Sequence, residues 1–555
     1  MIEKIVKKYK SNKTRLLDIF WDIQNQYNYV SQDHLQQLSK LINVSVPELN
    51  DTLSFYHFFH SDPCGEIKIY VDNSAISEIK GLDLIIEAFE KELNIKLGSS
   101  NEKFGLYTTS CIGLSDQAPC ALINGLPFNN LTVSKVKSIV QQLKQGKFPK
   151  EAISNEVHQK GPLLTDQYTK GEALDKNLHP DQIIDEVSKA GIRGRGGAGF
   201  RTGLKWQLCQ QQKEKVKYVV CNADEGEPGT FKDRYLLTKH PHMVIEGMCL
   251  AAKAIGAQKG LIYLRAEYKY LYDELNKVAQ EFDLDIRIQL GAGAYVVGEE
   301  TALLESLEGK RGEPRVRPPF PVEQGYLGKP TVVNNVETFA SVTKIIKHGH
   351  QWYRNFGTKE SPGTKLLSVS GDCQEGIYEI PWGMSIKEFC HMVKADNAYA
   401  VQVGGPSGKM VAADSDRKIA FEDLSTGGSM MVFNNKRDLL RVVKNFTEFF
   451  KNESCGCCLP CRAGNIVLDE QMDFILSDRA SKIDLERIKS WSHIISASSR
   501  CGLGQTCSNP ITSSLETFPD LYNNQVREHE TLFRHFDVQQ KTEDYERVIK
   551  EYEKN

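Results

Sequence analysis

Four cysteines within a short stretch constrain the fold of this chain more than any other feature. In ESCGCCLPCRAGN (453–465), Cys455, Cys458 and Cys461 have the spacing C-x2-C-x2-C. Two intervening residues let successive thiolates converge on one site, as at iron–sulfur clusters, which usually take a fourth ligand from elsewhere. Cys501, in SSRCGLGQTC, is the predicted fourth ligand. The fold must therefore bring two distant segments together.

Other uses of these cysteines are also open. A structural zinc site fits three close cysteines and a distant one. The chain has 14 cysteines and no recognisable export signal at its N-terminus, so we expect a reducing, cytoplasmic location in which disulfides are disfavoured. Cys457 and Cys507 lie beside the predicted ligands, and either can replace one of them.

Composition excludes several classes of protein. A chain of 555 residues is too long for one core, so several domains are expected. The net charge of -3 argues against a nucleic-acid binder, and no apolar run reaches the length of a membrane span. Neither a Ser/His/Asp grouping nor an HExxH motif is present. Bound cofactors are therefore expected to carry the chemistry.

Periodicity predicts a multidomain α/β protein. A helical cap and a small α/β unit are expected over residues 1–150. Short apolar strands alternating with helices then predict a largely parallel sheet within 151–355. A small strand-and-helix module follows over 356–432, and a nearly all-helical domain over 433–555.

A glycine-rich loop, GIRGRGGAGFRTGLKW (191–206), precedes the predicted sheet. Gly194, Gly196 and Gly197 leave room for a flat or anionic ligand to touch the backbone, and Lys205 can supply a charge to a phosphate. The order GRGGAG departs from the Rossmann fingerprint G-x-G-x-x-G. A flexible surface loop is the alternative interpretation.

Polar side chains gather after two predicted strands, where open α/β sheets bind ligands, and in two later segments. Carboxylates there suit ribose hydroxyls, and side-chain amides can bond a flavin edge. The alternatives are solvated helix starts for the glutamates and helix caps for the asparagines. The residues are Asn222, Asp224, Glu225 and Glu227 in CNADEGEPGTFKDR, Tyr295, Gly298, Glu299 and Glu300 in GAGAYVVGEE, Arg317 and Phe320 in PRVRPPFP, and Asn334 and Asn335 in NNVET.

Together these segments resemble the NADH-binding flavin subunit of respiratory complex I and its relatives. RGRGGAGF, CNADEGEPGTFKDR, GAGAYVVGEE, NNVET, SCGCCLPCR and RCGLG stand in that family's order between residues 193 and 504. The resemblance implies a Rossmann-like domain that binds FMN and NAD(H). It also implies a ubiquitin-like (SLBB) module and a C-terminal helical bundle with a [4Fe–4S] cluster.

The resemblance also implies roles for individual residues. Hydride would pass between NAD(H) and FMN, with Glu227 and Glu300 positioning the nicotinamide, and single electrons would pass to the cluster. Arg317 stands where the family has a lysine, and Gly226 where a serine is frequent. The implied FMN contacts are Gly194, Gly196, Gly197, Lys205, Asn222, Asp224, Tyr295, Gly298, Asn334 and Asn335; the NAD(H) contacts are Phe200, Glu225, Glu227, Glu300, Arg317 and Phe320; the cluster ligands are Cys455, Cys458, Cys461 and Cys501.

The first 150 residues resemble the thioredoxin-like subunit that accompanies this flavin subunit. Its four [2Fe–2S] ligand positions align with Asp72, Ser77, Cys111 and Ser115, so one cysteine of the four survives. We therefore expect a thioredoxin-like fold whose electron-transfer role has been lost. A rearranged cluster on Cys64, Cys111 and Cys120 with Asp72 is the alternative.

The fusion most resembles the diaphorase alpha subunits of cytoplasmic NAD-reducing [NiFe] hydrogenases. This implies a small iron–sulfur diaphorase subunit and the large and small hydrogenase subunits as partners. Two other interpretations remain. The same module can serve a formate dehydrogenase or complex I, or the chain can be a zinc-stabilised nucleotide-binding scaffold without redox activity.

Overall fold

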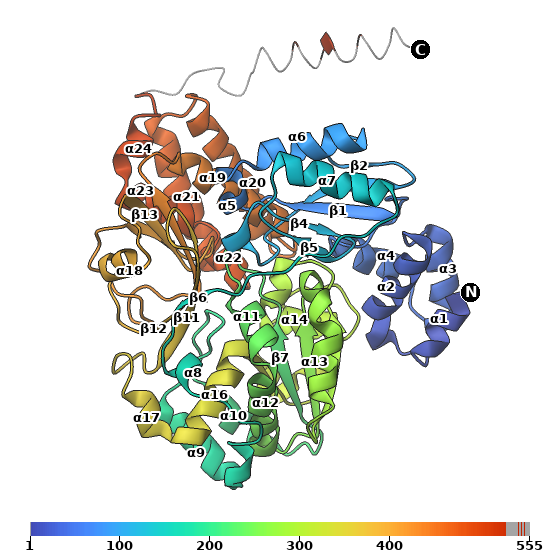
Figure 1. Ribbon diagram of the computed structural model, residues 1–555, viewed down its shortest axis with the longest axis vertical. Coiled ribbons are helices and arrows are strands. Elements are labelled where there is room, and N and C mark those ends of the chain that lie inside the picture. The colour runs from blue at the N-terminus through green and yellow to red at the C-terminus, as the bar shows by residue number, and fades with distance from the viewer. Residues whose placement is uncertain (1, 529–541, 543–544, 547–548, 550–555) are drawn as a thin grey trace.

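Four modules build the protein, of which the computed structural model describes residues 2–528, 542, 545–546 and 549 (Figure 1). The rest of the predicted domain 433–555 lies outside the described residues. The helices and sheets follow one another in the order that the sequence predicts. The boundaries predicted near residues 150, 355 and 432 stay predictions.

The N-terminal module joins a helical cap to a five-stranded sheet of order β2-β3-β1-β4-β5. Ser31 and Ser45 cap two of the cap helices by accepting hydrogen bonds from backbone N–H groups three residues on. Apolar residues of α6 and α7 pack against one face of the sheet (Figure 1). The elements are α1 (Ile2–Lys8), α2 (Leu16–Tyr27), α3 (Gln32–Ile42), α4 (Val46–Phe55), β1 (Ile67–Asp72), α5 (Ala75–Ile79), α6 (Leu82–Leu93), β2 (Ser99–Ser100), β3 (Phe104–Thr109), β4 (Ala121–Ile123), β5 (Leu126–Phe128) and α7 (Val133–Lys144).

The second module has a parallel four-stranded sheet of order β10-β7-β8-β9. Its strands are short and mostly apolar, as suits a sheet covered by helices on its faces. Because the strands are parallel, the loops that follow them meet at one edge. The strands are β7 (Tyr218–Ala223), β8 (Lys259–Leu264), β9 (Asp285–Leu290) and β10 (Thr331–Asn335); the helices are α8 (Pro162–Thr165), α9 (Pro180–Ala190), α10 (Thr202–Gln210), α11 (Lys232–Lys239), α12 (Pro241–Ile255), α13 (Tyr272–Ala279), α14 (Glu300–Leu307), α15 (Pro321–Gln324), α16 (Val336–His348) and α17 (His350–Arg354).

The third module is a six-stranded mixed sheet with α18 (Ile386–Met392). Its order is β14-β13-β15-β11-β12-β6. One edge strand, β6 (Val157–Gln159), comes from a segment that precedes the whole second module in sequence, and it pairs with β12. The other strands are β11 (Thr364–Gly371), β12 (Gly376–Pro381), β13 (Ala398–Val403), β14 (Lys409–Ala412) and β15 (Ser429–Asn434).

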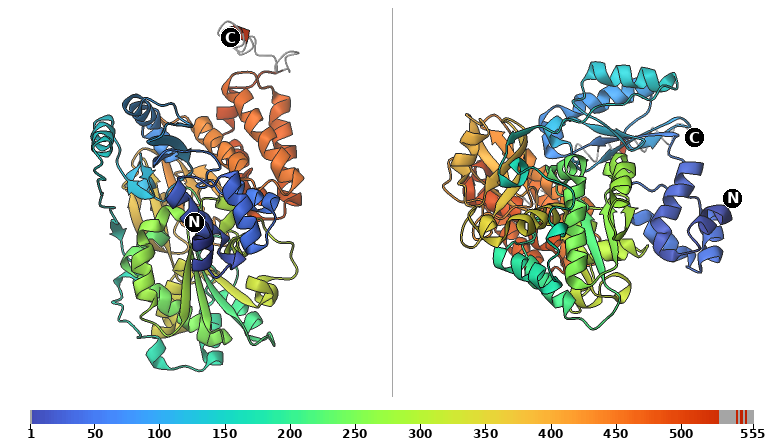
Figure 2. Two further views of the ribbon diagram at one scale, coloured as in Figure 1. Left: turned by 90° about the vertical axis from the view of Figure 1, so that its right-hand side faces the viewer. Right: turned by 60° about the horizontal axis from the view of Figure 1, so that its bottom comes forward.

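Helices make up the described part of the C-terminal module. They pack beside the N-terminal sheet, far away in sequence, with α19 against α5 (Figures 1 and 2). Within the described residues, no helix combines the length and apolar character needed to cross a bilayer. The helices are α19 (Leu439–Glu453), α20 (Leu459–Leu476), α21 (Lys482–Ser498), α22 (Gly502–Thr506), α23 (Asn509–Thr517) and α24 (Pro519–Asn523).

Candidate functional site

The polar residues predicted from the strand ends meet at one edge of the parallel sheet. Strand pairing places Asn335 opposite Asn222. The amide of Asn222 donates to the carbonyl of Gly298 at 2.8 Å, which ties the end of β7 to the segment after β9. Asn334 accepts a 2.8 Å hydrogen bond from the buried indole of Trp206. The ends of β7 and β10 are thus fixed to the segment after β9 and to α10.

The glycine loop bends back on itself beside this edge. The N–H of Gly194 donates to the carbonyl of Phe200 at 2.9 Å. Gly197 and Gly199 have φ values of +113° and +67°, which residues with a side chain rarely adopt. A Cβ at Gly194 would meet nothing closer than 3.7 Å, so the backbone there is open to a ligand.

Charged residues from three separate segments converge next to the loop. Lys205 Nζ lies 2.8 Å from Glu300 Oε2, and Arg317 Nη1 lies 3.7 Å from a carboxylate oxygen of both Glu299 and Glu300. Glu299 also caps α14 through Thr301 N and Ala302 N, each at 2.9 Å, so its helix-start interpretation holds as well. This grouping offers cations and carboxylates of the kind that bind phosphates and ribose hydroxyls.

Two of the predicted NAD(H) contacts are exposed aromatic side chains, and one of them lies beside the charged group. Phe200 is 49% exposed and Phe320 is 48% exposed, and the amine of Lys205 lies 5.9 Å from the centre of the Phe200 ring. Exposed phenylalanine rings beside polar groups suit a flat ring that stacks on the site.

The three carboxylates of the loop after β7 have different surroundings. Burial raises the pKa of Asp224 to about 8, and one of its oxygens is buried without a hydrogen-bond partner. Burial likewise raises the pKa of Glu227 to about 7; this residue accepts from the Tyr295 hydroxyl at 2.6 Å and the Ser407 N–H at 2.8 Å. An orphaned oxygen on Asp224 and an open glycine loop fit a bound FMN.

Glu225, a predicted NAD(H) contact, accepts hydrogen bonds from the start of a helix. Its carboxylate accepts from the N–H groups of Asp233 at 2.7 Å and Arg234 at 3.1 Å at the start of α11, and from the Tyr268 hydroxyl at 2.7 Å. Burial raises its pKa to about 7. The structure therefore gives Glu225 a helix-capping position, and its contact with NAD(H) stays a prediction.

The raised pKa of Asp224 leads to a prediction about stability. A carboxyl with a pKa near 8 when folded and about 3.9 when unfolded binds its proton more tightly in the folded state, so its contribution to stability falls as pH rises between these values. In the flavin-free protein, Asp224→Asn should leave the melting temperature nearly unchanged at pH 4.5 and raise it by about 3 °C or more at pH 8. Thermal scans across this range measure the difference. The exposed Asp396→Asn is the control, and a difference for Asp224→Asn that stays constant with pH would contradict the prediction.

The predicted cluster ligands surround one region of the C-terminal module. Cys458 stands just before α20, Cys461 lies in its first turn, and Cys501 stands just before α22. Burial raises the pKa of Cys455, Cys461 and Cys501, and in each case a second predicted ligand thiol adds to the effect. The four thiols are therefore close enough to influence one another, and all are free.

Small and polar neighbours complete the cluster region. A Cβ at Gly504 would lie 3.1 Å from that of Cys461, so glycine lets α22 approach the thiol. Asn465 Nδ2 donates to Cys461 Sγ at 3.3 Å, a hydrogen bond of the kind that tunes cluster potentials. Cys457 is exposed, whereas Cys507 is buried. Among the described residues, no three His, Cys, Asp or Glu side chains close on a point as a single metal ion requires.

The four positions aligned with the [2Fe–2S] ligands form a buried polar network. Asp72 accepts from the Ser77 hydroxyl at 2.8 Å and from the Ile112 N–H at 3.0 Å, and Cys111 Sγ lies 3.3 Å from the Ser115 hydroxyl. The structure thus brings all four positions together. Oxygen atoms occupy most of the place that thiolates would take in a ferredoxin.

Several residues of the site were not predicted. Trp206 orients Asn334, Asp233 Oδ2 accepts from Asn335 Nδ2 at 2.6 Å, and Ser407 of the third module reaches Glu227. Trp206 lies within the glycine-rich motif GIRGRGGAGFRTGLKW, and Asp233 lies within the motif CNADEGEPGTFKDR. Nothing in the sequence points to Ser407, because it lies in a different module.

Three family models match the chain. Residues 2–144 match the thioredoxin-like [2Fe–2S] ferredoxin, residues 187–344 the Nuo51 FMN-binding domain, and residues 441–525 the iron–sulfur binding region of NADH-ubiquinone oxidoreductase F. These matches fall on the first, second and fourth modules. They confirm the predicted fold class, the FMN domain and the iron–sulfur region.

Known relatives define the family further. The alpha subunit of the NAD-reducing hydrogenase HoxS of Cupriavidus necator is 46% identical, and the match covers 100% of this chain and 99% of the relative. HndC, an NADP-reducing hydrogenase subunit of Solidesulfovibrio fructosivorans, is 43% identical over 64% of this chain and 78% of its own length. A crystal structure of NAD+-reducing [NiFe]-hydrogenase in the H2-reduced state aligns with a TM-score of 0.91 and 38% identity, covering 96% of each chain. The chain belongs to the family of NAD-reducing hydrogenase alpha subunits, as the resemblance predicted.

Proposed function

We propose that the chain is the NAD(H)-oxidising and NAD+-reducing electron-transfer subunit of a soluble hydrogenase. It would work in the cytoplasm with a small iron–sulfur diaphorase subunit and the large and small subunits of a [NiFe] hydrogenase, and couple H2 oxidation to NAD+ reduction in either direction. The observation that carries this proposal is the full-length match to the HoxS alpha subunit, which includes the fused N-terminal module. The match to HndC covers only 64% of the chain.

Separate sets of residues would hold FMN and the [4Fe–4S] cluster. When bound, FMN exchanges a hydride with NAD(H) and single electrons with the [4Fe–4S] cluster. The glycine loop and Lys205 would hold the flavin phosphate, while the amides of Asn222, Asn334 and Asn335 would hold its ring. The amine of Lys205 donates to the Glu300 carboxylate and to the Val333 carbonyl in this structure. Cys455, Cys458, Cys461 and Cys501 would hold the cluster.

Nicotinamide binding would use the exposed aromatic rings and the charged group. Phe200 and Phe320 would cover the flat rings of NAD(H), and Arg317 would pair with its pyrophosphate. Glu227 and Glu300 would position the nicotinamide and its ribose. The same fold also serves complex I, whose FMN-binding and iron–sulfur families match the second and fourth modules. In that alternative the chain would deliver electrons to a different partner.

The proposal is tested by the purified complex of this chain with its co-purifying partners. We expect reduction of NAD+ under H2, and a kcat/KM for NADP+ at least about 30-fold lower, because carboxylates of the proposed dinucleotide pocket would repel the extra phosphate. Glu300→Gln should narrow this preference. A complex that lacks H2-dependent activity but oxidises NADH with a quinone would favour the complex I alternative, and a colourless zinc protein would overturn both.

A further inference from the structure

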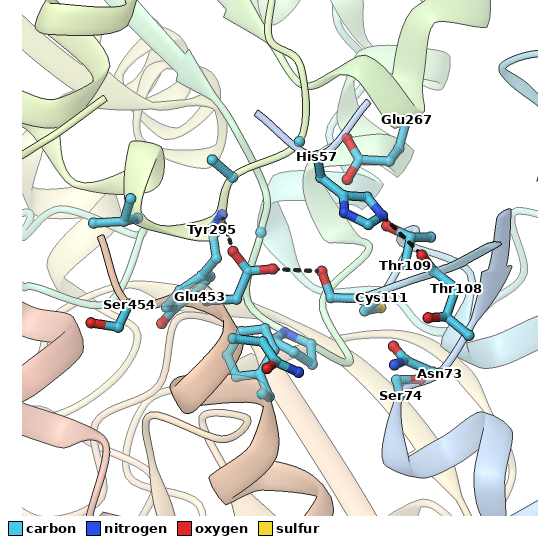
Figure 3. Close-up of a pocket in the computed structure, with 18 of the residues that line it drawn as sticks. His57, Asn73, Ser74, Thr108, Thr109, Cys111, Glu267, Tyr295, Glu453 and Ser454 are labelled. Atoms are coloured by element: carbon cyan, nitrogen blue, oxygen red, sulfur yellow. Dashed lines mark hydrogen bonds between the residues drawn. The ribbon is translucent and has the colours of Figure 1, made fainter. Parts of the chain in front are cut away.

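A polar cavity lies where three modules meet. Its volume is about 550 Å³, large enough for many water molecules. The end of β3 with Ser110 and Cys111 of the N-terminal module, the segment 293–296 of the second module and the end of α19 all line it (Figure 3). Cys455, the first predicted cluster ligand, reaches its wall. These segments are distant in sequence and lie close together only around the cavity.

Glu453 bridges this junction. It is the last residue of α19 and stands two residues before Cys455. Its Oε2 accepts a 2.9 Å hydrogen bond from the backbone N–H of Tyr295, and its Oε1 accepts a 3.2 Å hydrogen bond from the Ser110 hydroxyl (Figure 3). One carboxylate thus binds the second module through one oxygen and the N-terminal module through the other.

The side-chain hydroxyl of Tyr295 is also hydrogen-bonded. Its hydroxyl donates to Glu227 at 2.6 Å, and Glu227 in turn accepts from Ser407 of the third module. The Tyr295 ring also meets Phe449 of α19 edge-on, with 4.9 Å between ring centres. A continuous hydrogen-bonded chain therefore runs from Ser407 through Glu227, Tyr295 and Glu453 to Ser110, and it touches all four modules.

We infer that Glu453 is a positioning residue that fixes the separation between the flavin loop at Tyr295 and the cluster loop at Cys455. The inference rests on the proposed function, with Cys455 as a ligand of the cluster and Tyr295 as one of the FMN contacts that the family resemblance implies. Electron transfer between two bound groups falls steeply as they move apart, whereas hydride transfer within the flavin site does not involve the cluster loop. Loss of the bridge should therefore slow electron transfer from the flavin to the cluster and leave hydride transfer unchanged.

The test compares two substitutions in the FMN- and cluster-loaded protein. In Glu453→Gln, the amide oxygen can accept from Tyr295 N–H while the amide nitrogen donates to the Ser110 hydroxyl, so the bridge survives. In Glu453→Ala, both bonds are lost and water of the cavity can enter. We expect Glu453→Ala to slow reduction of the cluster by NADH about tenfold or more, because small misplacements of reacting groups are costly, with rescue in Glu453→Gln.

Two measurements separate the steps. Stopped-flow absorbance follows flavin bleaching by NADH, which should keep its rate and its apparent KM in both variants. Freeze-quench EPR follows the [4Fe–4S] signal, whose fully reduced spectrum should stay that of wild type and shows that the alanine variant is folded and loaded. Glu448→Ala is the matched control, since Glu448 lines the same cavity from the same helix but does not bond Tyr295 or Ser110.

The outcomes distinguish this inference from the proposed function. If the wild-type cluster is not reduced by NADH, the proposed function fails. If it is, and Glu453→Ala reduces its cluster at the wild-type rate, the positioning role is overturned. Equal slowing in Glu453→Ala and Glu453→Gln would overturn it too, because the bridge geometry would then not be the cause.

Discussion

Cys458→Ser is expected to lose the [4Fe–4S] EPR signal while FMN stays bound and is still bleached by NADH. A serine hydroxyl is a much poorer ligand for soft iron than a thiolate, and Cys458 stands at the start of α20 beside the other ligands. Electron transfer to the partner subunit should fall about 100-fold or more, since electrons from the flavin then lack their acceptor. Iron and sulfide analysis, EPR and partner reduction measure the effect.

Cys457→Ser provides the matched control for this prediction. Cys457 is its neighbour in sequence but is exposed, so its substitution should leave iron content and transfer at wild-type levels. The opposite result, with Cys458→Ser intact and Cys457→Ser devoid of cluster, would exchange the two ligand assignments. Loss of one zinc atom in place of iron would support the scaffold alternative.

Local spacing made much of this molecule predictable. The cysteine motif, the glycine loop and the polar ends of the strands are short runs of sequence whose geometry depends on nearby residues. Parallel strands then bring segments that are distant in sequence to one edge, and the structure pairs Asn222 with Asn335 there. The strand register brings residues from separate motifs together to form the site.

Contacts between modules could not be predicted from the sequence. Ser110 and Glu453 are 343 residues apart, and Ser407 and Glu227 are 180 apart; each pair meets only because separate modules pack in one arrangement. Polar residues on loops carry no periodicity that announces such partners. Glu225 shows the converse case, because its motif marks a ligand site while its carboxylate caps α11. A motif identifies a region, and packing decides which side chain of it faces the ligand.

The N-terminal module preserves the shape of a cluster site whose ligands have changed. Asp72, Ser77 and Ser115 are fully buried, and burying a carboxylate is costly unless it is well hydrogen-bonded. Asp72 meets this requirement by accepting from backbone N–H groups and from hydroxyls. We interpret this network as the replacement for metal–thiolate bonds in stabilising the loops after β1 and β3. The absence of a [2Fe–2S] cluster here stays a prediction.

Restoring the thiolates should restore a cluster. The variant Asp72→Cys/Ser77→Cys/Ser115→Cys, with the native Cys111, places four thiols in one buried site of a module that matches the thioredoxin-like [2Fe–2S] ferredoxin family. In a Cys458→Ser background, where the other cluster is removed, we expect a gain of two irons per chain and a [2Fe–2S] EPR signal on reduction, because such clusters ordinarily take four thiolates. Asp72→Asn/Ser77→Ala/Ser115→Ala in the same background replaces the same three side chains without adding thiols, and should bind no iron. Two irons in the Cys458→Ser parent would show instead that Cys64, Cys111 and Cys120 already hold a rearranged cluster, whereas an iron-free triple-cysteine variant that folds would mean that the loops have moved too far to close on one.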